Sequence, residues 1–216
     1  MTDGIAAVDW AMRIAKVPSN RIVILGQSLG TAATAAVVEH YALKGVEFAG
    51  VVVIAAFTDL PNLLTSYSIA GYVPILSPLK RYPAIQKLFI SQLVDKWPSV
   101  SRLTNFVRVS KRVRLFIIHA KDDYEIPCRH SDALFIATAN ATTDGGMDVG
   151  LISKMKARGT VDMGDGAYIS TWKAAGDKII RQEMIAYGGQ FPINFEYNWQ
   201  VACYAASSRI PEIESQ

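Results

Sequence analysis

The chain has 216 residues, of which half are hydrophobic and 19% are charged, and this composition excludes a disordered, collagenous or coiled-coil protein. Its net charge of +3 is too small to indicate binding to nucleic acid. The two cysteines, Cys128 and Cys203, cannot form a disulfide framework and lack the spacing of metal ligands, so we expect a reducing compartment and no metal. Thr2 and Asp3 follow Met1 directly, so we expect no signal peptide.

Short apolar runs alternate with helical stretches along the chain. The run RIVIL at 21–25 is typical of a strand that is buried on both faces of a parallel sheet. Strands that alternate with helices predict an α/β fold, with right-handed crossovers and a mostly parallel sheet flanked by helices. The expected helices cover residues 3–16, 31–43 and 131–139, and the expected strands cover residues 21–25, 48–57, 113–119 and 178–187.

Two segments interrupt this alternation. Residues 60–110 are expected to form a helical cap, because apolar residues recur at near-helical spacing between Pro83 and Pro98. Residues 142–177 form an insertion that is rich in glycine and aspartate on both sides of a short basic helix. Its aspartates lack the D-x-D-x-D-G spacing of a calcium loop, so we interpret them as solvated turns.

The expected cap is apolar at its start and basic overall. Residues 61–79 carry no charge and are about long enough to cross a bilayer. Pro74 and Pro78 interrupt them, which favours an apolar lid or a substrate channel over a membrane span. From Pro61 to Arg114 there are nine basic residues and one acid, which suggests a surface suited to anionic lipids. The basic residues of this surface are Lys80, Arg81, Lys87, Arg102, Arg108, Lys111 and Arg112.

Residues 26–30 read Gly-Gln-Ser-Leu-Gly, a G-x-S-x-G motif between an apolar run and an alanine-rich helix. In this position the motif predicts a nucleophile elbow, a sharp strand-to-helix turn that strains the backbone of Ser28. Small residues are expected on both sides because larger side chains would collide. Ser28 would be the nucleophile, and the backbone N–H of Leu29 at the helix N-terminus would stabilise an oxyanion. The alternative is a chance serine in an ordinary turn.

A second motif, HAKDDYEIP at 119–127, follows the third expected strand directly. Together with the elbow it resembles the α/β-hydrolase superfamily, in which the acid of a Ser-Asp-His triad lies four residues before a proline. The resemblance assigns this role to Asp123, since Asp122 is one residue out of step. The acid orients an imidazole and stabilises the imidazolium. Two alternatives stay open: a role for Asp123 as a cap of the next helix only, and a role for Asp59 after the second strand as the acid.

The order of elements, the basic cap and the long insertion are similar to the branch that contains monoacylglycerol and lysophospholipid lipases. This resemblance implies a lipid ester substrate, no cofactor and a location at the endoplasmic reticulum membrane. Because the sequence has no signal peptide and no convincing span, a cytoplasmic or peripheral location is also open.

The histidine of the family pattern is missing. The family places it after the last strand, commonly right after a glycine pair, and here the glycine pair is followed by Gln190. The three histidines of the chain, His40, His119 and His130, lie elsewhere, and we interpret all of them as structural. A glutamine cannot accept the proton of the serine, so the sequence predicts that the general base is absent.

Both ends of the chain also depart from the family. Few residues precede Ser28, so we expect residues 1–189 to be a partial hydrolase domain with the last four strands of the family and a bare apolar edge at 21–25. Residues 190–216 are expected to be a divergent tail, so that the chain is truncated at both ends. The predicted function is a serine hydrolase of lipid carboxylic esters that is catalytically impaired. The alternative is a non-catalytic remnant that binds a lipid or a protein.

Overall fold

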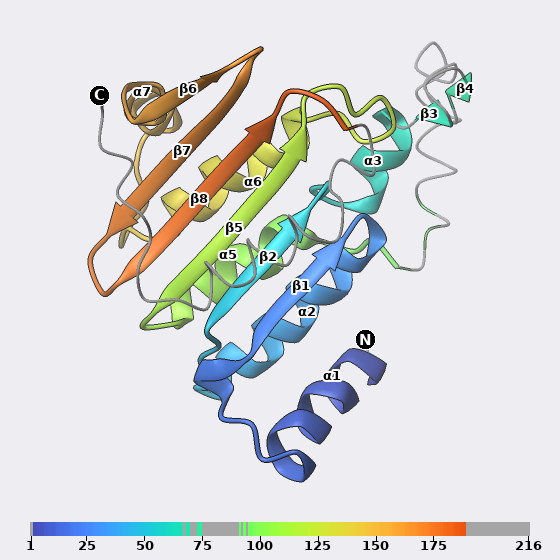
Figure 1. Cartoon of the computed structure of the whole chain (residues 1–216), viewed down its shortest axis with the longest axis vertical. Coiled ribbons are helices and arrows are strands. Elements are labelled where there is room, and N and C mark those ends of the chain that lie inside the picture. The colour runs from blue at the N-terminus through green and yellow to red at the C-terminus, as the bar shows by residue number, and fades with distance from the viewer. Residues whose placement is uncertain are drawn as a thin grey trace.

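A six-stranded sheet forms the centre of the molecule (Figure 1). The computed structural model describes residues 2–66, 68–69, 73–74, 91, 93 and 95–188. The strand order is β1-β2-β5-β8-β7-β6, in which β1, β2, β5 and β8 are parallel and β7 and β6 are antiparallel. The predicted α/β class is therefore confirmed. The strands are β1 Val23–Gln27, β2 Gly50–Ile54, β5 Val113–Ala120, β6 Thr160–Gly164, β7 Ala167–Ala174 and β8 Lys178–Ile185.

The four parallel strands are the four that the apolar runs predict. Strand β1 begins at Val23 rather than at Arg21, because residues Ser19–Arg21 form a 3-10 turn. The N–H of Ile22 closes this turn on the carbonyl of Ser19 at 3.0 Å. β1 pairs only with β2 among the described strands, so it is an edge strand. The expectation that it is buried on both faces is wrong, since Leu25 is 42% exposed.

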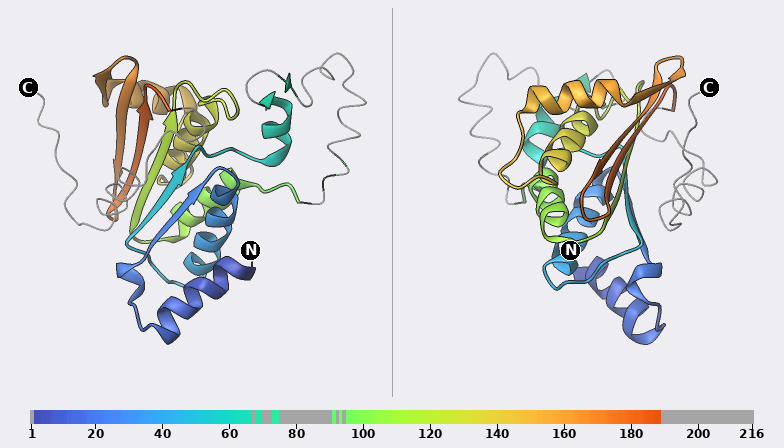
Figure 2. Two further views of the ribbon diagram at one scale, coloured as in Figure 1. Left: turned by 45° about the vertical axis from the view of Figure 1, so that its right-hand side comes forward. Right: turned by 90° about the vertical axis from the view of Figure 1, so that its left-hand side faces the viewer.

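The helices that cover the sheet lie on one of its faces (Figure 2). They are α2 Leu29–Ala42, α5 Ser99–Val109 and α6 Arg129–Asn140. Their buried side chains share one core with Val51, Val53, Leu115 and Ile117 of the central strands. Helix α5 falls within the segment expected to form the cap, yet Leu103 and Phe106 place it in this core.

The opposite face of the central strands is also apolar. Val52 and Ile54 of β2 and Phe116 and Ile118 of β5 form a second cluster, in which each residue is at most 2% exposed. Because successive side chains of a strand point to opposite faces, a strand that is buried on both faces must be apolar throughout. The continuous apolar runs of β2 and β5 reflect this requirement.

The N-terminal helix is interrupted. Helix α1 Thr2–Asp9 continues into a π-helical turn, Trp10–Ile14, instead of one regular helix to residue 16. Val8 is buried in the main core, and Ile5 and Met12 pack against it, so the apolar side of this segment faces the core.

The glycine- and aspartate-rich insertion contains more regular secondary structure than its sequence predicts. Its basic helix is present as α7 Val149–Arg158, but the following residues form the hairpin β6–β7 rather than turns alone. Asp165 and Gly166 form the two-residue turn, with φ values of 51° and 80°. These positive values are typical of a type I′ hairpin turn, which favours Asp-Gly. Strand β7 of this hairpin pairs with β8, so the hairpin extends the sheet beyond the four parallel strands.

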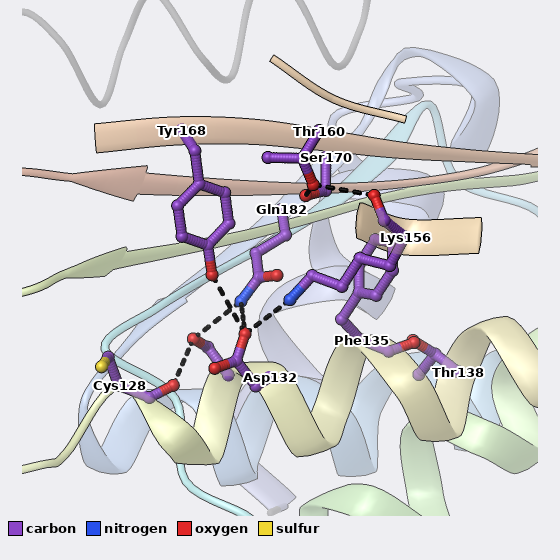
Figure 3. Close-up of polar contacts among 10 residues, drawn as sticks. Cys128, Asp132, Phe135, Thr138, Lys156, Thr160, Tyr168, Ser170 and Gln182 are labelled. Carbon is purple, nitrogen blue, oxygen red and sulfur yellow. Dashed lines mark hydrogen bonds and ion pairs between the residues drawn. The ribbon is translucent and has the colours of Figure 1, made fainter. Parts of the chain in front are cut away.

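A cluster of polar side chains connects the insertion to the rest of the domain (Figure 3). The Oδ1 atom of Asp132 on α6 accepts hydrogen bonds from Lys156 Nζ at 2.6 Å, Gln182 Nε2 at 3.0 Å and the Tyr168 hydroxyl at 3.1 Å. Burial alone would raise the pKa of Asp132, but the hydrogen bonds from Lys156, Gln182 and Tyr168 and the charge of Lys156 leave it lowered. The same cluster raises the pKa of Tyr168, through burial and the charge of Asp132. The cluster joins α6, α7, β7 and β8.

Only part of the expected cap is described. It contains α3 Leu60–Ser66 and a small pair of strands, β3 Ser68–Ile69 and β4 Val73–Pro74. Within the described ranges no helix is both long and apolar enough to cross a membrane. Most of the predicted helix between Pro83 and Pro98 lies outside the described residues, and residues 95–98, which are described, are not helical. The basic residues Lys80, Arg81 and Lys87, the position of Gln190 and the tail at 190–216 also lie outside the described residues.

Candidate active site

The candidate catalytic residues follow the carboxyl ends of three parallel strands. Ser28 follows β1, Asp59 lies beyond the end of β2, and Asp123 lies beyond the end of β5. Because these strands are parallel, their carboxyl ends meet at the same edge of the sheet (Figure 1). Neighbouring strands lie about 4.8 Å apart, so the ends of β1 and β5 are roughly 10 Å apart. Ligands of open α/β sheets bind at this edge.

Ser28 has the strained backbone that the elbow requires. Its φ of 51° and ψ of −123° lie outside the regions that residues other than glycine ordinarily adopt. Two contacts stabilise this conformation: the Ser28 N–H donates to the carbonyl of Ile54 at 2.9 Å, and the Ser28 carbonyl accepts from the Thr31 hydroxyl at 2.6 Å. Helix α2 begins at the next residue. The predicted strand-to-helix turn at Ser28 is confirmed.

The two glycines of the motif are not equivalent. A Cβ atom on Gly26 would overlap the carbonyl group of Gly30 and the hydroxyl of Thr34, whereas a Cβ on Gly30 would have no atom within 4 Å. The expectation that larger side chains collide on both sides is therefore right for Gly26 and wrong for Gly30. Gly26 allows the first turn of α2 to pack tightly against the end of β1.

Leu29 is the first residue of α2, so its N–H lies among the first N–H groups of the helix, which have no partner within the helix. The positive end of the helix dipole adds to the attraction that such a group exerts on a negative charge. The arrangement can therefore stabilise an oxyanion that forms on a carbonyl bound at Ser28. The Leu29 side chain is 55% exposed.

Asp123 is held by its own loop. Its Oδ1 atom accepts from the backbone N–H groups of Glu125 at 2.9 Å and Ile126 at 2.8 Å. Its side chain is fully buried, and its Oδ2 atom has no hydrogen-bond partner among the described residues. In a complete triad the imidazole donates a hydrogen bond to the carboxylate of the acid. An acid that lacks its imidazole therefore has an oxygen atom with no hydrogen-bond partner.

Asp59 is engaged differently. Its Oδ1 atom accepts from the backbone N–H of Asn62 at 2.8 Å and its Oδ2 atom from the Asn62 side chain at 2.6 Å. It immediately precedes α3, so these contacts are those of a helix N-cap. Of the two candidate acids, Asp123 therefore has an oxygen atom available, whereas both oxygen atoms of Asp59 are engaged in capping a helix.

The three histidines of the chain lie in different environments. His40 lies eleven residues beyond Leu29 on α2, which is about 17 Å along the helix axis. His119 at the end of β5 is fully buried, with Nε2 2.7 Å from the carbonyl oxygen of Ile126. His130 is 4% exposed, and its Nδ1 lies 3.1 Å from the Thr58 hydroxyl.

The basicity of His130 is also low. Burial is the largest cause that lowers the pKa of His130 to about 4, with a smaller contribution from the charge of Arg129. A general base works best when its pKa is near the working pH, so His130 is a poor proton acceptor at neutral pH. In the described part of the chain no group of three or more His, Cys, Asp or Glu side chains could hold a metal ion.

The family model described as the prolyl oligopeptidase family matches residues 1–157. The chain belongs to the prolyl oligopeptidase family. The matched residues include both the elbow and the loop of Asp123. The protein is therefore an α/β-hydrolase of the serine hydrolase kind.

Two solved structures are similar to this member of the prolyl oligopeptidase family. The ydeN gene product from B. subtilis has a TM-score of 0.41 and 13% identity, covering 94% of this chain and 75% of that protein. The Paleococcus ferrophilus monoacylglycerol lipase has a TM-score of 0.41 and 12% identity, covering 95% of this chain and 74% of that protein. No curated protein matches the chain.

Proposed function

We propose that this member of the prolyl oligopeptidase family is a serine hydrolase of carboxylic esters with a slow turnover. Ser28 is the nucleophile, the Leu29 N–H is an oxyanion donor, and Asp123 is the acid. The observation that carries this proposal is the strained Ser28 backbone at the start of α2, at the same sheet edge as the Asp123 carboxylate, whose Oδ2 atom has no hydrogen-bond partner among the described residues.

In this proposal the Ser28 hydroxyl attacks the ester carbonyl carbon, and the carbonyl oxygen becomes an oxyanion near the Leu29 N–H. The hydroxyl proton has to leave during this attack. In a complete triad an imidazole takes it and then gives it to the leaving alcohol. Because His119 is buried against Ile126 and His130 is weakly basic, the serine proton goes to water and the leaving alcohol takes its proton from water, so turnover is slow.

A lipid ester, such as a monoacylglycerol or a lysophospholipid, is the substrate class that we propose. Its support is apolar surface at the carboxyl edge of the sheet, where Leu29, Tyr124 and Tyr187 are 55%, 74% and 71% exposed. These residues come just after β1, β5 and β8. Exposed tyrosine and leucine side chains suit the acyl part of an ester and a lipid–water interface. A peripheral location at the endoplasmic reticulum membrane belongs to the same proposal.

A fluorophosphonate probe tests the nucleophile. We expect slow labelling of the chain, no labelling of Ser28→Ala, and faster labelling when free imidazole is added as a substitute base. A panel of esters with short and long acyl chains, together with a prolyl peptide, tests the substrate class. Faster turnover of the peptide than of any ester would contradict the ester proposal.

The second candidate is a non-catalytic remnant that binds a lipid or a protein. The unpaired Oδ2 atom of Asp123 favours it, because a working acid would be paired with the base. Absence of Ser28-dependent labelling at every imidazole concentration, with the chain folded, would support this candidate instead.

A further inference from the structure

Strand β5 contains, near its carboxyl end, a histidine that the proposed reaction does not use. His119 is the penultimate residue of β5, and its side chain is 0% exposed, as is that of Asp123 four residues later. The His119 Nε2 atom lies 2.7 Å from the carbonyl oxygen of Ile126 and 3.4 Å from the Oδ2 atom of Asp123. The imidazole therefore lies between the strand end and the carboxylate.

The direction of the His119 hydrogen bond follows from its partner. A backbone carbonyl can only accept, so Nε2 carries the hydrogen and donates it to Ile126. The Oδ2 atom of Asp123 has no hydrogen-bond partner among the described residues, which is consistent with this direction, although Nε2 is within ion-pair distance of it. His119 therefore holds the loop without occupying the free oxygen atom of the acid.

Ile126 connects the two side chains. Its N–H donates to the Oδ1 atom of Asp123 at 2.8 Å, and its carbonyl accepts from His119 at 2.7 Å. The residue itself is 1% exposed, so the whole arrangement is buried. Moving the Ile126 backbone would move the donor that fixes the orientation of the carboxylate. His119 is placed to prevent this movement.

We propose that His119 is a positioning residue, which acts through the Ile126 backbone to fix the Asp123 carboxylate with its Oδ2 atom free for an imidazole. This inference rests on the proposed function, because it gives Oδ2 the role of accepting from a base. Removing the His119 donor should let the loop shift and misplace the carboxylate. A misplacement of about 1 Å can lower a rate by about a hundredfold.

The experiment compares His119→Phe with His119→Gln in the full chain. Phenylalanine keeps the ring but cannot donate, whereas the glutamine amide can still donate to the Ile126 carbonyl. The first readout is the carboxyl resonance of Asp123 in protein labelled with ¹³C-aspartate, assigned with Asp123→Asn. We expect this resonance to move in the phenylalanine variant and to stay in place in the glutamine variant. The Asp132 resonance is the internal control and should not move in either.

The second readout is labelling of Ser28 by a fluorophosphonate in the presence of free imidazole. We expect labelling of His119→Phe to be about a hundredfold slower than that of the parent chain, and labelling of His119→Gln to be close to it. An unchanged Asp123 resonance in a folded His119→Phe variant would overturn the proposal. If the parent chain is not labelled but the Asp123 resonance moves as expected, the proposed function fails and the positioning role of His119 stands.

A measurement on the parent chain makes the test independent of how the variants fold. The ¹⁵N signals of the His119 ring should show a protonated Nε2 and an unprotonated Nδ1. The opposite tautomer would overturn the proposal, because Nε2 could then not donate to Ile126.

Discussion

The Nζ atom of Lys156 lies 2.6 Å from the Oδ1 atom of Asp132, and this contact joins helix α7 of the insertion to helix α6 of the domain. The lysine side chain is 13% exposed and lies over the rings of Phe135 and Tyr168 at 5.1 and 5.4 Å. With three donors on one carboxylate oxygen (Figure 3), the ionised form of Asp132 is preferred, and its pKa is lowered.

This contact predicts a pH dependence of stability. Because the pKa of Asp132 is lower in the folded chain, its stabilising contribution is complete above the pKa of an unfolded aspartate, about 3.9. It is lost as the pH falls through the folded-state value. We expect the melting temperature of Asp132→Asn to fall less steeply with acid than that of the parent chain. Asp162→Asn, at an exposed position on β6, is the control. Identical pH profiles for Asp132→Asn and the parent would contradict the prediction.

The two glycines of the elbow should respond differently to alanine. In Gly26→Ala the new methyl group overlaps Gly30 and Thr34, so we expect a loss of about 1–3 kcal/mol or more in the free energy of unfolding. In Gly30→Ala the methyl group enters open space within a helix, so we expect unchanged stability or a gain of up to about 1 kcal/mol. Urea unfolding of both variants measures the difference. Equal effects would mean that the elbow is not packed as described.

The edge strand β1 should promote association of the chain. Leu25 on this strand is 42% exposed, and an apolar edge is a template for pairing with another strand. We expect Leu25→Lys to reduce self-association in analytical ultracentrifugation, because a lysine on an edge opposes pairing. Leu43→Lys is the matched control, since Leu43 is 67% exposed next to the end of α2 and is not on the edge. An equal effect of both substitutions would indicate that the added charge itself, and not its position on the edge strand, reduces self-association.

Ester turnover should be slow and nearly independent of Asp123. Loss of the histidine from a serine hydrolase triad costs on the order of 10⁶-fold in turnover, as in subtilisin. In a complete triad an Asp-to-Asn change costs about 10⁴-fold, but here the Oδ2 atom of Asp123 has no hydrogen-bond partner among the described residues, although it lies 3.4 Å from the Nε2 atom of His119. We therefore expect Asp123→Asn to leave the residual rate unchanged, and to lower it only when free imidazole is present. A large loss without imidazole would reveal a histidine that reaches Ser28.

We propose that the basic residues of the expected cap bind anionic vesicles. Arg102 and Arg112 form ion pairs with Glu39 at 3.7 Å and Asp177 at 3.5 Å, so their charges are partly neutralised. We expect alanine at Lys80, Arg81 and Lys87 together to weaken co-sedimentation more than alanine at Arg102 and Arg112, at about 1 kcal/mol per effective charge. High salt should remove the binding. Equal binding to neutral vesicles would contradict an electrostatic mechanism.

The hairpin β6–β7 shows where the reading of the sequence was incomplete. Its signal was present, because Asp165-Gly166 between alternating apolar residues is a strong pattern for a two-residue hairpin turn. The expectation of solvated turns rested on the absence of calcium-loop spacing among the aspartates, which does not address the φ values that a hairpin turn needs. The insertion is attached to the domain by Asp132, Lys156 and Tyr168, which are far apart in the sequence and could not be paired in advance.

The sequence by itself determined the features that depend on neighbouring residues. Continuous apolar runs predicted β2 and β5, because burial on both faces leaves no position for a polar side chain. The G-x-S-x-G motif predicted the strained backbone of Ser28, because a strand that turns directly into a helix allows few conformations. Only the tertiary structure decided that Asp59 caps α3 while Asp123 keeps a free oxygen atom. It also decided that the His119 imidazole is hydrogen-bonded to the Ile126 carbonyl. These features depend on where backbone donors and acceptors meet after folding, and the residue types alone do not specify that.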